Sequence, residues 1–129
     1  MKRFFMILLL AGSFTAVHAS HDWIFLNGNN EESVYYWSDI RQDRNNPNIK
    51  IVRLVINSGH KQESNASDVV FDCTNKTFHF ENYTRYDQYF ARGNITRTRT
   101  RRGTTHSVGD RMPGYASSQE LYTQACNNH

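Results

Sequence analysis

Arginines crowd one short stretch of the sequence, GNITRTRTRRGTTHS, which covers residues 93–107. Four of them fall within six positions: Arg97, Arg99, Arg101 and Arg102. Guanidinium groups are always charged and bind carboxylates, sulfates and phosphates through paired hydrogen bonds. On a strand, alternate residues project from one side at roughly 6.6–7 Å spacing, which suits a row of such contacts. We hypothesise that these four residues bind an acidic ligand; a solvated strand edge is the competing interpretation.

Histidines are the other residues that could support chemistry. The sequence contains six, at positions 18, 21, 60, 79, 106 and 129. None has an acidic neighbour at the spacing of a catalytic triad or of a metal site. We therefore expect no catalytic residues, no metal and no cofactor. A secreted ribonuclease built from His79, His106 and the arginines is the enzymatic alternative, and it requires these side chains to converge in the fold.

The first residues, MKRFFMILLLAGSFTAVHAS, have the pattern of a secretory signal peptide. Lys2 and Arg3 precede an apolar run from Phe4 to Leu10, and small or apolar residues lead up to Ala19. A membrane anchor would need about 20 apolar residues, and this run is shorter. The pattern predicts cleavage after Ala19, so that residues 1–19 are a signal peptide and residues 20–129 form one exported domain with no transmembrane segment.

The net charge of the whole chain is +3, and the predicted signal carries two of these positive charges. The exported part is therefore close to neutral, at about +1, and its positive charge is concentrated in the arginine segment. Nucleic-acid binding usually requires a strongly basic field over the whole domain. We therefore expect no nucleic-acid partner.

Both cysteines, Cys73 and Cys126, lie in the exported part. An even number of cysteines in an oxidising compartment predicts a disulfide. The bridge would close a loop of about 54 residues and stabilise the domain by roughly 4 kcal/mol on a chain-entropy argument. Neither cysteine has a second cysteine or a histidine at zinc-binding spacing.

Six segments have the β-branched, aromatic or alternating composition of strands. They cover residues 23–26, 33–38, 50–57, 68–73, 78–83 and 96–101. In the fifth segment Phe78 and Phe80 are expected to face the core, with His79 and Glu81 on the polar face. Residues 58–67 are expected to be a polar loop. The arginine segment has no apolar face, which predicts an edge strand or a mobile hairpin arm. The nearby tyrosines, at positions 83, 86 and 89, are expected at the core and rim of the sheet.

A helix is predicted near the end of the sequence. Ser117 is a favourable N-cap, and Glu120 three residues later completes a capping box. Leu121, Tyr122 and Ala125 share one face at helical spacing. The sequence thus predicts an α+β fold, in which an antiparallel meander of about six strands is covered by a C-terminal helix and closed by one disulfide.

Several motifs along the chain resemble the surface-adhesin protein E family, which consists of small exported proteins of Gram-negative bacteria. They are VVFDCTNKTFHF, YDQYFARG, a basic segment, MPGYASSQELYTQAC and a terminal NN. The matching positions are Tyr35–Tyr36, Ile51–Ile56, Val69–Cys73, Tyr83–Gly93 and Pro113–Cys126. The resemblance implies an antiparallel sheet with a C-terminal helix packed on it and a Cys73–Cys126 disulfide.

The resemblance also implies a non-catalytic role at the bacterial surface. Partners would be host matrix or serum proteins of the laminin, vitronectin or plasminogen type, or an acidic polysaccharide contacted by the arginines. Two features depart from the family pattern: residues 108–112 lack its tryptophan, and no lipid-attachment cysteine follows the predicted signal. Export to the cell surface, to the periplasm or out of the cell therefore all stay open. A periplasmic accessory or inhibitor-like protein is the alternative function.

Overall fold

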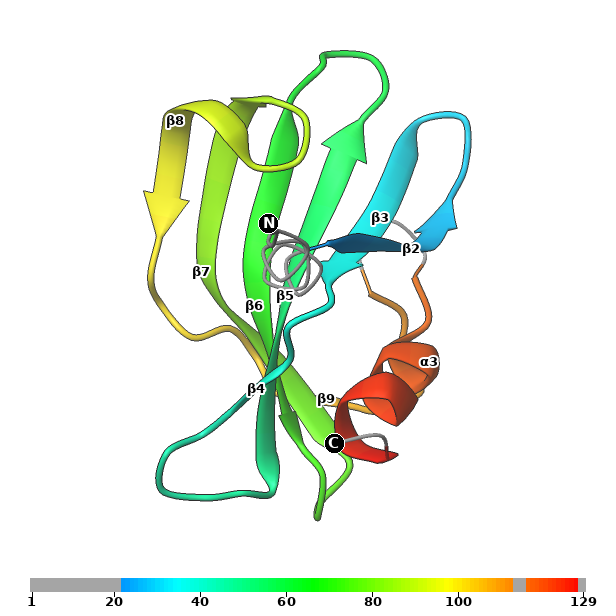
Figure 1. Ribbon diagram of the computed structural model, residues 1–129, viewed down its shortest axis with the longest axis vertical. Helices are drawn as coiled ribbons and strands as arrows, with labels where there is room; N and C mark the ends of the chain where they lie inside the picture. Colours follow the sequence, from blue (N-terminus) through cyan, green and yellow to red (C-terminus); the bar gives the residue numbers. More distant parts are fainter. Residues whose placement is uncertain (1–21, 113–115, 128–129) are drawn as a thin grey trace, which may run out of the picture.

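The computed structural model describes residues 22–112 and 116–127 as an antiparallel sheet with a short helical segment near the end of the chain (Figure 1). The predicted signal peptide, residues 1–19, lies outside the described residues. The strands are β2 (Trp23–Gly28), β3 (Glu32–Trp37), β4 (Arg41–Gln42), β5 (Ile49–Ser58), β6 (Ser64–Asp72), β7 (Thr77–Gln88), β8 (Arg92–Arg99) and β9 (His106–Ser107). The helix α3 (Ser118–Tyr122) continues into a π-helical turn, η4 (Thr123–Asn127).

The sheet has eight strands, so the prediction of about six was too low. Six of them follow the order β2-β3-β5-β6-β7-β8, with every neighbour antiparallel. The two additional strands are two-residue segments: β4 pairs with β5 beyond the end of β3, and β9 pairs with β7 beyond the end of β8. Both are polar and too short to show a strand pattern in the sequence.

Strand β6 begins at Ser64, although residues 58–67 were predicted to be a loop. The prediction was wrong from Ser64 onward. Residues 64–67 are small or polar and show no alternation of apolar residues, so they resemble a loop in the sequence. In the structure, however, Ser64 and Ala66 are fully buried within the strand. The Ser64 hydroxyl donates a hydrogen bond to the carbonyl of Gln88 at 2.6 Å. A tertiary contact with β7 therefore extends this strand.

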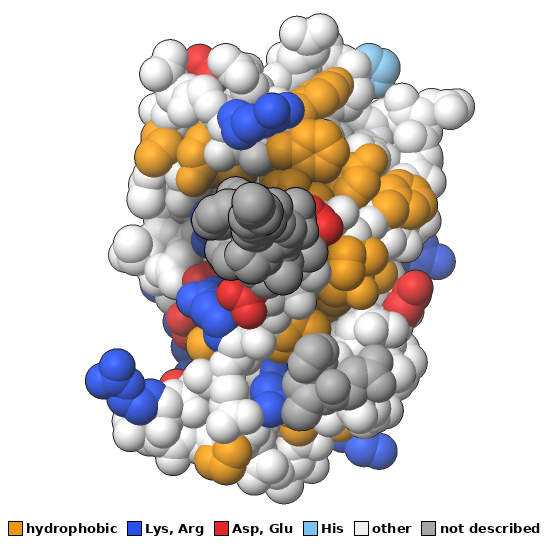
Figure 2. Space-filling model, in the orientation of Figure 1, with side chains coloured by type: hydrophobic (Ala, Val, Ile, Leu, Met, Phe, Trp, Pro, Cys, Tyr) orange, Lys and Arg blue, Asp and Glu red, His pale blue; other side chains and the backbone are white. Residues whose placement is uncertain are grey.

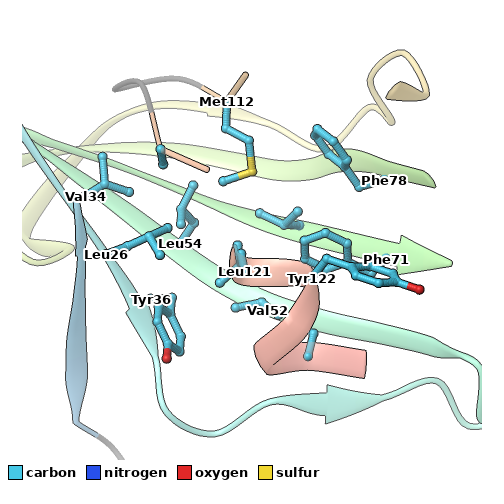
Figure 3. Close-up of a cluster of buried hydrophobic side chains, with 13 residues drawn as sticks. Leu26, Val34, Tyr36, Val52, Leu54, Phe71, Phe78, Met112, Leu121 and Tyr122 are labelled. Atoms are coloured by element: carbon cyan, nitrogen blue, oxygen red, sulfur yellow. The ribbon is translucent and has the colours of Figure 1, made fainter. Parts of the chain in front are cut away.

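The main core lies between one face of the sheet and the C-terminal helix. In Figure 3, Leu121 and Tyr122 lie beside Val52, Leu54 and Phe71 of the sheet. The remaining buried members of this cluster are Leu26, Val34, Tyr36, Val69, Phe78, Met112, Ala116 and Ala125. Alternate residues of each strand supply this face, as expected for a pleated sheet.

The predicted helix start and the predicted disulfide are both confirmed. Ser117 caps the helix, and its hydroxyl accepts a hydrogen bond from the backbone N–H of Glu120 at 3.1 Å. Cys73 and Cys126 are bonded, with their Cα atoms 5.7 Å apart. The Tyr122 hydroxyl donates to the carbonyl of Cys73 at 2.9 Å. The helix is therefore joined to the end of β6 by both a covalent bond and a hydrogen bond.

The opposite face of the sheet holds a smaller aromatic cluster. Trp23 stacks on Trp37 with ring centroids 5.6 Å apart, and Tyr35 contacts Phe25 at 5.4 Å and Phe90 at 4.8 Å. Figure 2 shows hydrophobic side chains gathered over the hairpin of β2 and β3. Strand β5 is covered on both faces, since its adjacent residues Leu54 and Val55 point to opposite faces and are both buried.

The turn between β7 and β8 has an unusual backbone. Phe90 and Ala91 have φ angles of 60° and 56°, in the left-handed region that residues other than glycine rarely adopt. Two buried side chains fix this turn: Asn57 accepts from the N–H of Phe90 at 2.9 Å, and Ser64 accepts from the N–H of Ala91 at 3.0 Å. The turn therefore has a defined conformation that places Phe90 on the aromatic cluster.

Within residues 22–112 and 116–127, no helix is both long and apolar enough to span a membrane.

Candidate ligand-binding surface

The arginine segment forms an edge of the sheet. Strand β8 pairs with β7 in the order of strands, and all of its residues are exposed. The prediction of an edge strand is therefore confirmed for residues 96–99, whereas the strand begins earlier, at Arg92, and Arg101 lies beyond its end. Arg97 lies opposite Arg85, and Arg99 lies opposite Tyr83. Directly opposed residues of an antiparallel pair project from the same face, so these side chains belong to one surface.

Three of the four predicted arginines come together around one hollow. Arg97, Arg99 and Arg101 line a cavity of about 420 Å³ on the face of the sheet that also carries the main core. Arg102 is not among the lining residues, and its guanidinium instead donates to the hydroxyl of Thr105 at 3.2 Å. We call the three lining arginines the arginine wall.

The floor of this hollow is apolar. Leu54 is only 2% exposed, and Ile56 and Phe80 are half-buried against the main core. The remaining lining residues are Glu32, Asn65, Ser67, Glu81, Tyr83 and Gly103. The sequence did not point to this floor, because Ile56 and Phe80 have the same pattern as ordinary core residues. The length of the predicted helix could have indicated this floor, because so short a helix cannot cover the whole core face of the sheet.

The arginine wall carries uncompensated charge. No hydrogen bond or ion pair joins the side chains of Arg97, Arg99 or Arg101 to any other residue that the structure describes. Two arginines on the other face behave differently: Arg41 and Arg53 both bind the buried carboxylate of Asp68, at 3.0 and 3.2 Å. A guanidinium without a carboxylate partner stays available for an acidic ligand, whereas one that already binds a buried carboxylate does not.

Two acidic residues border the hollow. The Glu81 carboxylate accepts from His79 Nε2 at 2.6 Å, so this acid already has a partner. Glu32 lines the hollow from the start of β3, which is separated from β8 by β5, β6 and β7 in the sheet. The hollow is therefore positive on the β8 side and negative at β3.

Tyr83 lines the hollow beside the arginine wall, directly opposite Arg99. Its hydroxyl donates to Asn65 Oδ1 at 2.7 Å, and Arg85 Nε donates to the same oxygen at 3.1 Å. Tyr83, Tyr86 and Tyr89 are all half-buried, in agreement with the predicted position at the core and rim. Of the three, Tyr83 lines the hollow.

The two histidines of the ribonuclease alternative, His79 and His106, do not lie together in the fold. His79 was predicted to face solvent on a polar face, but it is buried, because it lies opposite the buried Val70 of β6 and contacts the Glu81 carboxylate at 2.6 Å. His106 belongs to β9, lies opposite Phe78 in the sheet and stacks on its ring, with the ring centroids 5.3 Å apart. Successive strand residues point to opposite faces, so the imidazoles of His79 and His106 lie on opposite sides of the sheet. The ribonuclease alternative required them to converge, and they do not.

No three His, Cys, Asp or Glu side chains gather into a possible metal site within the described part of the chain.

Two titratable groups outside the hollow have shifted pKa values with structural causes. The pKa of Asp72 is lowered by hydrogen bonds from the backbone and side chain of Asn75, with a smaller contribution from the N–H of Thr74. The pKa of Tyr36 is raised by burial and, to a smaller extent, by the nearby charge of Glu120. Asp72 fixes the turn after β6, and Tyr36 belongs to the main core.

The fold is thus of the α+β type, with a single antiparallel sheet and one disulfide. The C-terminal helix covers part of one face of the sheet, and the rest of that face forms the hollow beside the basic edge strand. Two solved structures share this fold. Crystal form II of Haemophilus influenzae protein E is 19% identical, with a TM-score of 0.59, and the match covers 78% of this chain and 86% of that one. Protein E from non-typeable Haemophilus influenzae is 20% identical, also with a TM-score of 0.59, over 78% of this chain and 75% of that one. The chain therefore has a protein E-like fold.

No protein-family model matches the sequence, and no curated protein matches it.

Proposed function

We propose that this chain is an exported, adhesin-like binding protein that contacts an acidic ligand through its arginine wall and performs no catalysis. The observation that carries the proposal is that the guanidinium groups of Arg97, Arg99 and Arg101 surround one hollow and have no partner among the described residues. The protein E-like fold supports it, together with the motifs that resemble the surface-adhesin protein E family. Arg102 lies next to the wall in sequence and would contribute at its margin.

The ligands would be host matrix or serum proteins of the laminin, vitronectin or plasminogen type, or an acidic polysaccharide. Each presents carboxylates or sulfates that guanidinium groups bind well. Because the arginine wall is exposed, its attraction for such groups is screened by salt. Binding should therefore weaken steeply as the salt concentration rises.

The test measures binding of the exported chain, with its disulfide intact, to immobilised heparin, laminin and vitronectin across a salt series. The triple variant Arg97→Gln, Arg99→Gln, Arg101→Gln removes the wall. Its control is Arg44→Gln, Lys61→Gln, Lys76→Gln, which removes the same charge from exposed residues that do not line the hollow. We expect salt-sensitive binding that the first variant loses and the control keeps. Equal loss in both variants, or tight binding that neither changes, would contradict the proposal.

Cell fractionation tests the proposed location separately. A surface or culture-medium location agrees with an adhesin-like role. Recovery from the periplasm alone would instead support an accessory or inhibitor-like protein.

A further inference from the structure

The apolar floor of the hollow has no role in binding a purely hydrophilic polyanion. Helix α3 and the turn η4 cover only part of the core face, where Leu121 and Tyr122 lie beside Val52, Leu54 and Phe71 (Figure 3). Beyond the helix the same face continues through Ile56 and Phe80, which pack against the core from one side and line the hollow from the other. The result is a recess whose base extends the hydrophobic core and whose edge is the arginine wall.

The hollow has the composition of a small-molecule site. Such sites are mostly apolar, with a few polar groups that orient the ligand, and they enclose roughly 300–1,000 Å³. This one encloses about 420 Å³. Its unpaired cations all belong to β8 and the residues just after it, while Glu32 lies at the β3 side. An anionic group is therefore attracted to the β8 side and repelled from the β3 side, which fixes the direction in which a ligand would lie.

We propose that the hollow binds an amphipathic anion, an aliphatic or acyl chain that ends in a carboxylate or a phosphate. The chain would lie on Leu54, Ile56 and Phe80, and the anionic group would accept hydrogen bonds from the arginine wall. This inference rests on the proposed function for the role of the arginines and adds a specific ligand class. Removing apolar surface from water and pairing the guanidinium groups both favour the complex.

The first experiment titrates the exported chain with dodecanoate, below its micelle concentration, by calorimetry. Dodecyl maltoside has an alkyl chain of similar length but no charge, and acetate has the carboxylate but no long alkyl chain. We expect dodecanoate to bind with one site per protein and at least tenfold more tightly than either control. Equal affinity for dodecyl maltoside would overturn the role of the arginine wall, and no binding of dodecanoate would overturn the inference.

Blocking variants separate this inference from the proposed function. Ser67→Phe puts a bulky ring into the hollow without removing an arginine or a floor residue. Gly103→Leu does so from the other side, where an added Cβ would come no closer than 3.4 Å to the backbone of Phe80. Either variant that keeps the thermal unfolding midpoint of the native chain is suitable. We expect loss of dodecanoate binding with heparin binding retained, whereas the triple arginine variant should lose both.

The source of the anionic group is tested with lysophosphatidic acid and with vesicles of phosphatidylglycerol. Binding of the monomeric lipid, but not of intact vesicles, would support a free amphiphile as ligand. Vesicle binding that Ser67→Phe leaves unchanged would assign the arginines to a membrane surface and overturn the role of the hollow. Dodecanoate binding without any heparin binding would contradict the polyanion part of the proposed function and leave this inference in place.

Discussion

Arg97 lies directly opposite Arg85 across the ladder between β7 and β8. The Arg85 side chain donates a hydrogen bond to Asn65 Oδ1 at 3.1 Å, while the Arg97 side chain has no partner among the described residues. Like charges that face each other across strands destabilise a sheet, by a few tenths of a kcal/mol to about 1 kcal/mol. The stability of the fold does not explain this pair, because a neutral residue at position 97 would destabilise the sheet less.

The substitution Arg97→Gln should therefore raise the free energy of unfolding slightly, by roughly 0.3 kcal/mol, because it removes the repulsion. The same variant should bind heparin more weakly. Urea unfolding measured beside Arg44→Gln, which removes an exposed charge elsewhere, provides the comparison. A loss of more than about 1 kcal/mol would mean that Arg97 stabilises the fold instead.

The disulfide should contribute much of the stability of this small domain. Replacing both Cys73 and Cys126 by Ser should lower the free energy of unfolding by about 3–4 kcal/mol, because the unfolded chain regains the freedom of a long loop. Guanidinium unfolding of the native chain with and without reductant measures the same quantity independently. If the double variant and the reduced chain are both as stable as the oxidised protein, this expectation is wrong.

Asp72 should make stability depend on pH in the acidic range. Its pKa in the folded protein is lowered by hydrogen bonds from Asn75, so it stabilises the fold above its unfolded pKa of about 3.9. This contribution is lost as the pH falls through the lowered folded pKa. Asp72 lies near the surface, so the effect should stay below about 1 kcal/mol.

Asp72→Ala should consequently be less stable than the native chain at pH 7, and the difference should shrink between pH 4 and lower values. Urea unfolding at several pH values measures it, with Glu31→Ala as an exposed control. A difference that grows on acidification would contradict the stated direction of the pKa shift.

Ala91→Gly should stabilise the protein. Ala91 has a φ of 56°, and a left-handed conformation costs a residue with a Cβ roughly 1–2 kcal/mol that glycine does not incur. The greater freedom of glycine in the unfolded chain offsets part of this gain, so we expect a net increase of about 0.5 kcal/mol. Thr98→Gly in strand β8 is the control, and it should destabilise. A destabilising effect of Ala91→Gly would show that its methyl group contributes packing that outweighs the strain.

Features that depend on neighbours in the sequence were predictable. The helix start rests on Ser117 and Glu120, which lie within one helical turn of each other, and the edge strand rests on the lack of an apolar face between residues 96 and 101. The disulfide was predictable for a different reason, because two cysteines allow one intramolecular pairing. Each of these inferences needs only residue types and short spacings.

Features that depend on distant partners were not predictable. The burial of His79 depends on its position opposite Val70 of β6, and the strand at His106 exists through its pairing with Phe78. The hollow is the clearest case. Ile56 has the pattern of a core residue, and only the length of the helix decides that it lines an open recess instead.

The disulfide also determines how the protein would respond to mechanical tension. A pull on the chain outside the bridge passes from Cys73 directly to Cys126, so the 53-residue separation between them, roughly 180 Å of contour length, cannot be drawn out. Strands β7 and β8 lie entirely within this closed loop. Tension applied to the ends of the chain would first peel away β2, β3 and β5, while the hairpin that carries Arg97 and Arg99 would stay outside the path of the force.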